Sequence, residues 1–151
     1  MTGWQWIRTV LNWLNLTTLV GLLIALAGRA SLRRGPGGLV VAADYRLPVP
    51  KQTCLTMGNL VICRRPADWL LSEEHAGLLG HEARHATQYA FFGPLFWPLY
   101  GLASLWSWAV TGGYGSHNVF ERRAGLDAGG YADLPLRGWA AHLAALFSSP
   151  R

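Results

Sequence analysis

The segment "LLGHEARHATQY", residues 78–89, places two histidines, a glutamate, an arginine and a glutamine within an otherwise apolar stretch. On a helix, His81 and His85 lie one turn apart and point the same way, because positions four apart share a face. Polar groups in apolar surroundings are costly unless they find partners. The segment therefore predicts a helix whose two imidazoles converge on one metal ion.

The residue after the first histidine suggests what the ion would do. Glu82 lies one position round the helix from His81, so it can approach a third coordination position without ligating directly. This is the arrangement that zinc hydrolysis requires, with Zn²⁺ as the expected cofactor. Zinc lowers the pKa of its water toward about 7, and Glu82 is the expected general base. The alternative is a coincidental pair of surface histidines.

Residues on either side define the helix. Ser72 can cap its start, and the acidic pair that follows suits a first turn. Gly93 and Pro94 end it. The pattern predicts a helix from about residue 73 to about residue 91.

The HEARH motif resembles the active-site helix of the zincins, which are zinc metallopeptidases. Extended to Gln88 it reads HExxHxxQ, which resembles a group of small bacterial zincin-like domains. There a short strand with a glycine precedes the motif helix, as "MGNLVIC", residues 57–63, does here. The resemblance covers about residues 53–130 and implies a zincin-like core, a zinc ion and peptide-bond hydrolysis.

The third zinc ligand implied by this resemblance is Glu121. In gluzincins the ligand is a glutamate on a later helix with a small residue three positions on, and "FERRAGLDAG", residues 120–129, is similar. Many gluzincins then place an aspartate that holds a zinc-bound histidine. Here Gly125 takes that position and Asp127 comes two positions late, which leaves the orientation of that histidine open.

Other roles compete at these positions. Asn118 and Glu121 also form a capping-box pattern, in which Glu121 only closes a helix start. His117 can be the third ligand instead, or it can stabilise an oxyanion. Gln88 shares the metal face and can bond the substrate backbone or a ligand histidine, or merely a nearby loop.

The N-terminal segment from Val10 to Gly28 contains no charged residue, and it is about long enough to cross a bilayer. Tryptophans 4, 6 and 13 lie where an interfacial belt is expected. Residues 1–28 are therefore predicted to be a transmembrane anchor, with a cleaved signal peptide and a soluble core helix as alternatives. "RASLRRGPGGL" follows and predicts a linker at 29–38, which leaves 39–151 as the metal domain.

Two features bear on which side of the membrane holds that domain. Arginines 29, 33 and 34 follow the span and only Arg8 precedes it, which favours the cytoplasmic side. In "CLTMGNLVIC", residues 54–63, a hairpin turning at Gly58–Asn59 sets Cys54 opposite Cys63. A disulfide there favours an oxidising compartment, whereas in a reducing one the pair is two small apolar residues.

The composition limits the partners. Only 14% of the 151 residues are charged, against about 25% in soluble domains, which indicates contact with a bilayer or a partner. The net charge of +5 comes mostly from arginines in scattered pairs, so nucleic acid is not expected.

Residues 89–115 are uncharged and aromatic, and they predict a second span or a buried or interfacial helical hairpin. The segment 89–108 would cover the site or dip into the bilayer.

These observations predict a mainly helical α+β fold: a zincin-like core with a short β-hairpin and an N-terminal membrane helix. The expected function is a membrane-associated zinc metallopeptidase acting on peptides or membrane proteins. The expected location is a membrane, with one anchor and the metal domain on the cytoplasmic side. The alternative is a non-catalytic, zinc-stabilised binding or assembly module. A weaker third interpretation is a membrane-perturbing protein in which HEARH is coincidental.

Overall fold

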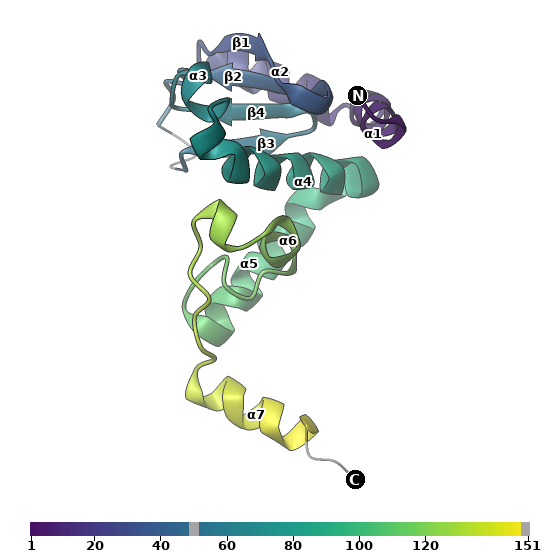
Figure 1. The fold of residues 1–151 in the computed structure, drawn as a ribbon. Helices are drawn as coiled ribbons and strands as arrows, with labels where there is room; N and C mark the ends of the chain where they lie inside the picture. The colour runs from purple at the N-terminus through teal and green to yellow at the C-terminus, as the bar shows by residue number, and fades with distance from the viewer. Residues whose placement is uncertain (49–51, 149–151) are drawn as a thin grey trace. The chain divides into compact units, whose positions relative to one another are not determined.

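The computed structural model describes residues 1–48 and 52–148, and it is mainly helical with one small sheet. This confirms the predicted α+β class. The chain divides into two compact units, Met1–Phe96 and Trp97–Arg151. The first unit contains the sheet, and all of its elements are shown in Figure 1.

The sheet has the strand order β1-β2-β4-β3. Strands β2 and β4 are parallel and the two outer pairs are antiparallel. The predicted hairpin register is confirmed, because Cys54 pairs with Cys63 and Met57 pairs with Leu60. Gly58 begins the tight turn with φ +60°, a conformation that glycine adopts without strain. The strands are β1 (Ser31–Arg34), β2 (Val40–Ala43), β3 (Cys54–Met57) and β4 (Leu60–Cys63).

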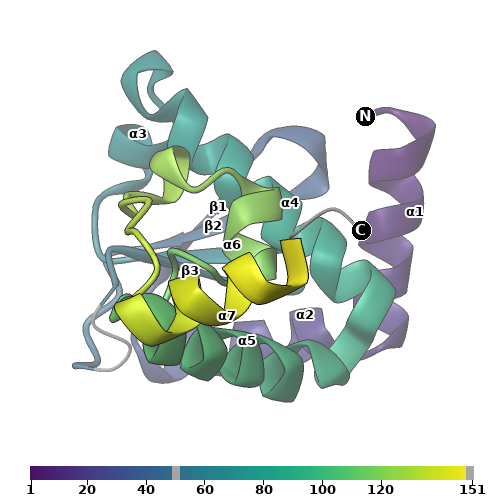
Figure 2. The same ribbon diagram turned by 90° about the horizontal axis from the view of Figure 1, so that it is seen from below.

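Alternate residues of a strand point to opposite sides of the sheet. In this sheet both sets of side chains pack against helices. On one face, a buried cluster that includes Val61 and Cys63 packs against α3 (Ala67–Leu70) and α4 (Ala76–Phe92). On the other face, Met57 lies against α2 (Thr17–Ala27). Figure 1 shows α4 running along β3, with α2 on the far side of the sheet. Figure 2 shows the first unit from the α4 side.

The motif helix α4 ends where the sequence predicted. Gly93, with φ +53°, is its C-cap, and Pro94 follows in a 3-10 turn (Gly93–Leu95). Its start differs slightly, because residues 73–75 form a separate 3-10 turn before α4 begins at Ala76. Ser72 is the N-cap of that turn, with its hydroxyl donating to the carbonyl of Trp69 rather than accepting from the helix.

The N-terminal segment is not the single helix that was expected. It forms α1 (Gly3–Leu14) and α2, bent by 73° at Asn15 and Leu16. The bend has a local cause: the side chain of Asn15 accepts from the backbone and the hydroxyl of Thr17, and Leu16 takes a left-handed φ of 64°. Within residues 1–48 and 52–148, no one helix has both the length and the apolarity to cross a membrane. The bent pair α1–α2 meets those two requirements only when its helices are taken together.

Both N-terminal helices are packed into the first unit. The side-chain amide of Asn12 on α1 donates to Asn59 Oδ1 at 3.0 Å and to the carbonyl of Ala86 on α4 at 2.9 Å. Thr18 on α2 accepts from the backbone of Asn59 at 3.1 Å. The expected linker at 29–38 instead contributes strand β1 and a 3-10 turn (Pro36–Gly38).

The closest approach of α2 to the sheet is at Gly21, and it supports a stability prediction. A Cβ added there would lie 2.9 Å from the carbonyl oxygen of Met57, and backbone cannot move aside cheaply. We expect Gly21→Val to lower the free energy of unfolding by about 1–3 kcal/mol through overpacking. Thermal denaturation would measure the change.

The matched control is Gly77→Val on α4, where an added Cβ meets nothing within 4 Å. It should leave the melting temperature nearly unchanged. If Gly21→Val left the melting temperature equally unchanged, α2 would not be held against the sheet. That result would fit a helix that leaves the domain to cross a bilayer.

The second unit is built mostly from α5 (Phe96–Thr111). The expected span or hairpin at 89–115 is instead the end of α4 followed by this one helix. Pro98 falls in the first turn of α5, where its missing N–H breaks no helical bond. The remaining elements are α6 (Val119–Ala124), a 3-10 turn (Asp127–Gly129) and α7 (Gly138–Ser148).

Candidate metal centre

The two motif histidines meet as the sequence predicted. His81 and His85 are both buried on α4, and their Nε2 atoms lie 3.0 Å apart. The two rings are nearly perpendicular, at 83°. Both Nε2 atoms are thus turned toward one point beside the helix, as a shared ion requires.

Gln88 sets the tautomer of one of these rings. Its Oε1 lies 2.8 Å from His85 Nδ1. A carbonyl oxygen only accepts, so Nδ1 carries the proton and Nε2 keeps the lone pair that binds a metal. Of the roles expected for Gln88, the structure shows the hydrogen bond to a motif histidine, His85. Such partners orient a ligand ring and raise its basicity.

Glu82 is held in place by the sheet. Its Oε2 accepts a hydrogen bond from the hydroxyl of Thr56 on β3 at 2.5 Å, and its side chain is buried. The Thr56 hydroxyl also lies 3.3 Å from the backbone carbonyl of Glu82. The sequence reasoning missed Thr56. The available signal was a lone polar side chain on the inward face of an apolar hairpin arm.

The facing cysteines lie on the same face of the hairpin as Thr56. Cys54 and Cys63 are buried free thiols with their sulfurs 2.7 Å apart. The hydrogen bond to Cys63, together with burial, raises the pKa of Cys54, so this thiol keeps its proton at neutral pH. The predicted cross-strand pairing is confirmed, and the two residues are present as thiols.

In the second unit, Glu121 is a buried carboxylate on α6. Its Oε1 accepts from the hydroxyl of Tyr100 on α5. Burial, followed by the negative charge of Glu121, raises the pKa of Tyr100, so this hydroxyl stays a donor. Asn118 caps α6 by accepting from the backbone of Phe120 at 2.8 Å, as the capping pattern predicted for that residue. Nothing in the sequence singled out Tyr100 from its aromatic neighbours.

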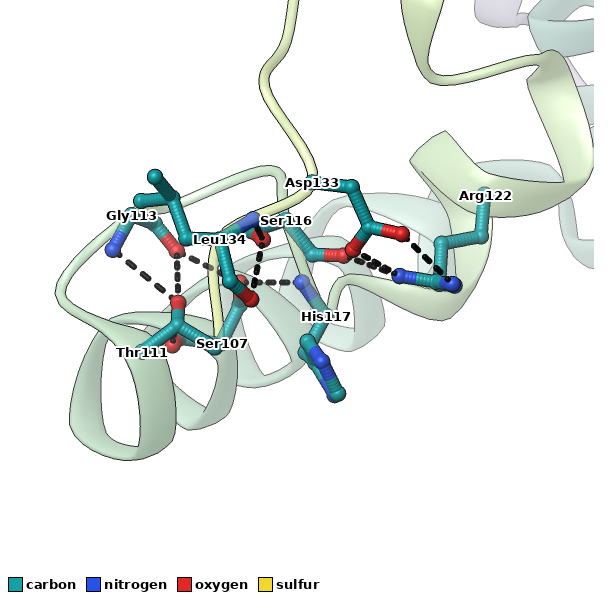
Figure 3. Close-up of polar contacts among 8 residues, drawn as sticks. All are labelled: Ser107, Thr111, Gly113, Ser116, His117, Arg122, Asp133 and Leu134. Carbon is teal, nitrogen blue, oxygen red and sulfur yellow. Dashed lines mark hydrogen bonds and ion pairs between the residues drawn. The ribbon is translucent and has the colours of Figure 1, made fainter. Parts of the chain in front are cut away.

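The loop before α6 is fixed by backbone hydrogen bonds (Figure 3). The N–H of His117 donates to Ser107 Oγ at 2.7 Å, and Arg122 donates to the carbonyl of Ser116 at 2.8 Å. Arg122 also pairs with Asp133, and this hydrogen bond lowers the pKa of the Asp133 carboxyl. Figure 3 shows the His117 imidazole pointing away from this network. The backbone of His117 therefore helps to position α6, while its side chain takes no part in these bonds.

The first unit thus offers two buried imidazole donors, His81 and His85, and the second unit carries a buried carboxylate, Glu121. Two imidazole nitrogens and one carboxylate oxygen match the protein ligands of one class of catalytic zinc site. Comparisons with protein-family models, curated proteins and solved structures found no match to this chain.

Proposed function

We propose that the chain is a membrane-associated, zinc-dependent metallopeptidase. One observation carries the proposal: His81 and His85 converge through their Nε2 atoms while the neighbouring Glu82 carboxylate is buried and held by Thr56. A metal ion shared by the two Nε2 atoms would account for their close approach. A helix that used these residues only for packing would have no need to bury a carboxylate beside them.

Glu82 is the general base in this proposal and leaves the metal to other ligands. The Thr56 hydroxyl satisfies one carboxylate oxygen and fixes the rotation of the side chain. A positioned carboxylate can then take a proton from the attacking water and hand it to the leaving amine. A bound zinc would supply the Lewis acid that lowers the pKa of that water and polarises the scissile carbonyl.

The other residues of the α4 face position these groups. Gln88 keeps His85 in the tautomer whose Nε2 is a ligand. Phe96 lies beside the His85 ring, with 6.1 Å between the ring centroids, and adds to its apolar surroundings. A site with few water molecules strengthens the electrostatic interactions within it. The substrate class proposed is a peptide or a membrane protein near the bilayer.

Glu121 is the proposed third ligand. It is a buried carboxylate, and the Tyr100 hydroxyl occupies one of its oxygens in the way that outer-shell donors orient ligating carboxylates. His117 is the competing candidate. Its loop is fixed through the backbone and leaves the imidazole outside the network of Figure 3.

We therefore expect Glu121→Ala to weaken zinc binding more than His117→Ala does. Loss of an outer-shell partner typically costs about 10–100-fold in metal affinity, so loss of a direct ligand should cost at least about 100-fold. Competition with a chelator of known affinity would measure both variants. The reverse order of effects would move the third ligand to His117.

Membrane association rests on the surface of the chain as a whole rather than on the metal site. It is supported by the low charge of the chain and by exposed apolar side chains on α1, including Trp6 and Trp13. The bent pair α1–α2 is the proposed anchor: its exposed apolar side chains would enter the bilayer while its other faces stay packed on the hairpin and on α4. The arginines that follow it favour a cytoplasmic metal domain.

This location predicts that the protein sediments with membranes and resists protease added outside intact cells, while lysis makes it cleavable. Western blotting against a C-terminal epitope would follow the digestion. Cleavage of the domain from outside would reverse the proposed sidedness, and recovery in the soluble fraction would remove the anchor.

A further inference from the structure

Arg8 is a buried cation that the proposed reaction does not use. Its side chain, on α1, is 4% exposed. Its two terminal nitrogens donate to backbone carbonyls, of Gly37 at 2.6 Å and of Ala83 at 3.4 Å. Its Nε has no hydrogen-bond partner in the part of the chain that the structure describes. Within residues 1–48 and 52–148, no carboxylate forms an ion pair with it.

This arrangement leaves a positive charge without a counter-charge. Carbonyl dipoles solvate a guanidinium in part, but they do not neutralise it. Buried charges in proteins are normally paired, because removing an ion from water is costly unless another charge compensates it. An anion supplied from outside the chain would complete this site.

A cavity of about 300 Å³ opens beside Arg8. That volume is at the lower end of the range for small-molecule sites. Apart from Arg8 and Gln5 its walls are glycine and apolar side chains, from the loop at Pro36–Leu39 and from one stripe of α4. The α4 stripe consists of Ala76, Leu79, Gly80 and Ala83.

The cavity is separate from the metal centre, although both lie on α4. The spacing of 76, 79, 80 and 83 defines one face of the helix, and the spacing of 81, 85 and 88 defines another. At 100° per residue these two faces point in nearly opposite directions. A ligand in the cavity would therefore contact the back of the helix that carries His81 and His85.

We propose that this cavity binds an amphipathic monocarboxylate, with its carboxylate on the guanidinium of Arg8 and its aliphatic part along Leu39 and Leu79. One guanidinium balances one negative charge, and its planar N–H groups match a carboxylate. The apolar walls favour a ligand with a hydrocarbon body over a small hydrophilic anion. The site belongs wholly to the first unit and does not depend on zinc.

Calorimetric titration of the purified full-length protein with hexanoate, 1-hexanol and inorganic phosphate would test this inference. Hexanoate should bind saturably and at least about tenfold more tightly than either of the others, since a hydrogen bond to a charged group is stronger than one between neutral groups. Arg8→Met should weaken hexanoate binding by at least the same factor.

A second pair of variants keeps the test valid if Arg8→Met fails to fold. Gly80 and Gly77 are both helical glycines whose added Cβ meets nothing within 4 Å, but only Gly80 lines the cavity. Gly80→Leu should block hexanoate, and Gly77→Leu should bind it like the unmodified protein. The proposal is overturned if Gly80→Leu binds normally, or if hexanol or phosphate binds as tightly as hexanoate.

Discussion

Replacing Glu82 with glutamine is expected to reduce peptide hydrolysis by a factor of about a hundred to ten thousand, with zinc content and folding unchanged. Glutamine has nearly the same volume and can still accept from Thr56, so the hydrogen bond at 2.5 Å need not be lost. It cannot take a proton from water. Cleavage of a broad peptide library, followed by mass spectrometry, would measure the change.

The control for this variant is Glu74→Gln. It removes the same charge from an exposed residue in the 3-10 turn that precedes α4. It should cleave like the unmodified protein. Equal cleavage by Glu82→Gln would exclude Glu82 as the base. If neither form cleaved any peptide while both held zinc, the chain would be better described as a non-catalytic, zinc-stabilised membrane module.

The double variant His81→Ala, His85→Ala is expected to lose its zinc. The purified protein should hold about one zinc ion per chain, because the two Nε2 atoms 3.0 Å apart define one site. Removing both nitrogens leaves too few protein ligands for a stable zinc site, which usually has three or four. Elemental analysis after dialysis would measure the stoichiometry.

A paired change at the remaining helix histidines gives the comparison. The His75 ring lies against Trp69, tilted by 40°, and its Nδ1 lies 3.0 Å from Ser72 Oγ, while His142 is exposed on α7. His75→Ala, His142→Ala should therefore keep the metal. Zinc at full occupancy in the His81→Ala, His85→Ala protein would refute the metal centre, and with it the peptidase proposal.

The features that sequence predicted well are those set by short-range geometry. The one-turn spacing of His81 and His85 follows from the helix period alone. The pairing of Cys54 with Cys63 follows from a two-residue turn. In both cases the partners lie within ten residues of each other, so no knowledge of the tertiary structure was needed.

The features that it missed depend on distant contacts. Thr56 reaches Glu82 only because β3 packs against α4. Tyr100 reaches Glu121 from another helix, 21 residues earlier in the chain, and the sequence pattern did not predict how these two helices pack. The N-terminal segment was predicted from its hydropathy to be one transmembrane helix, with a signal peptide and a soluble core helix as alternatives. A hydrogen bond between Asn15 and Thr17 bends it, and Met57 holds α2 against the sheet.

The hydrogen bonds of Asn12 and Thr18 to the hairpin and to α4 have a practical consequence for anyone producing this protein. A domain with an apolar N-terminal segment is commonly trimmed before expression to improve its solubility. Cutting at Gly28 would uncover Met57 and the side of β3 and β4 that faces α2, and would leave the Asn59 side chain without Asn12. The trimmed protein should aggregate, whereas the intact chain, extracted in a mild detergent, keeps the sheet covered on both faces.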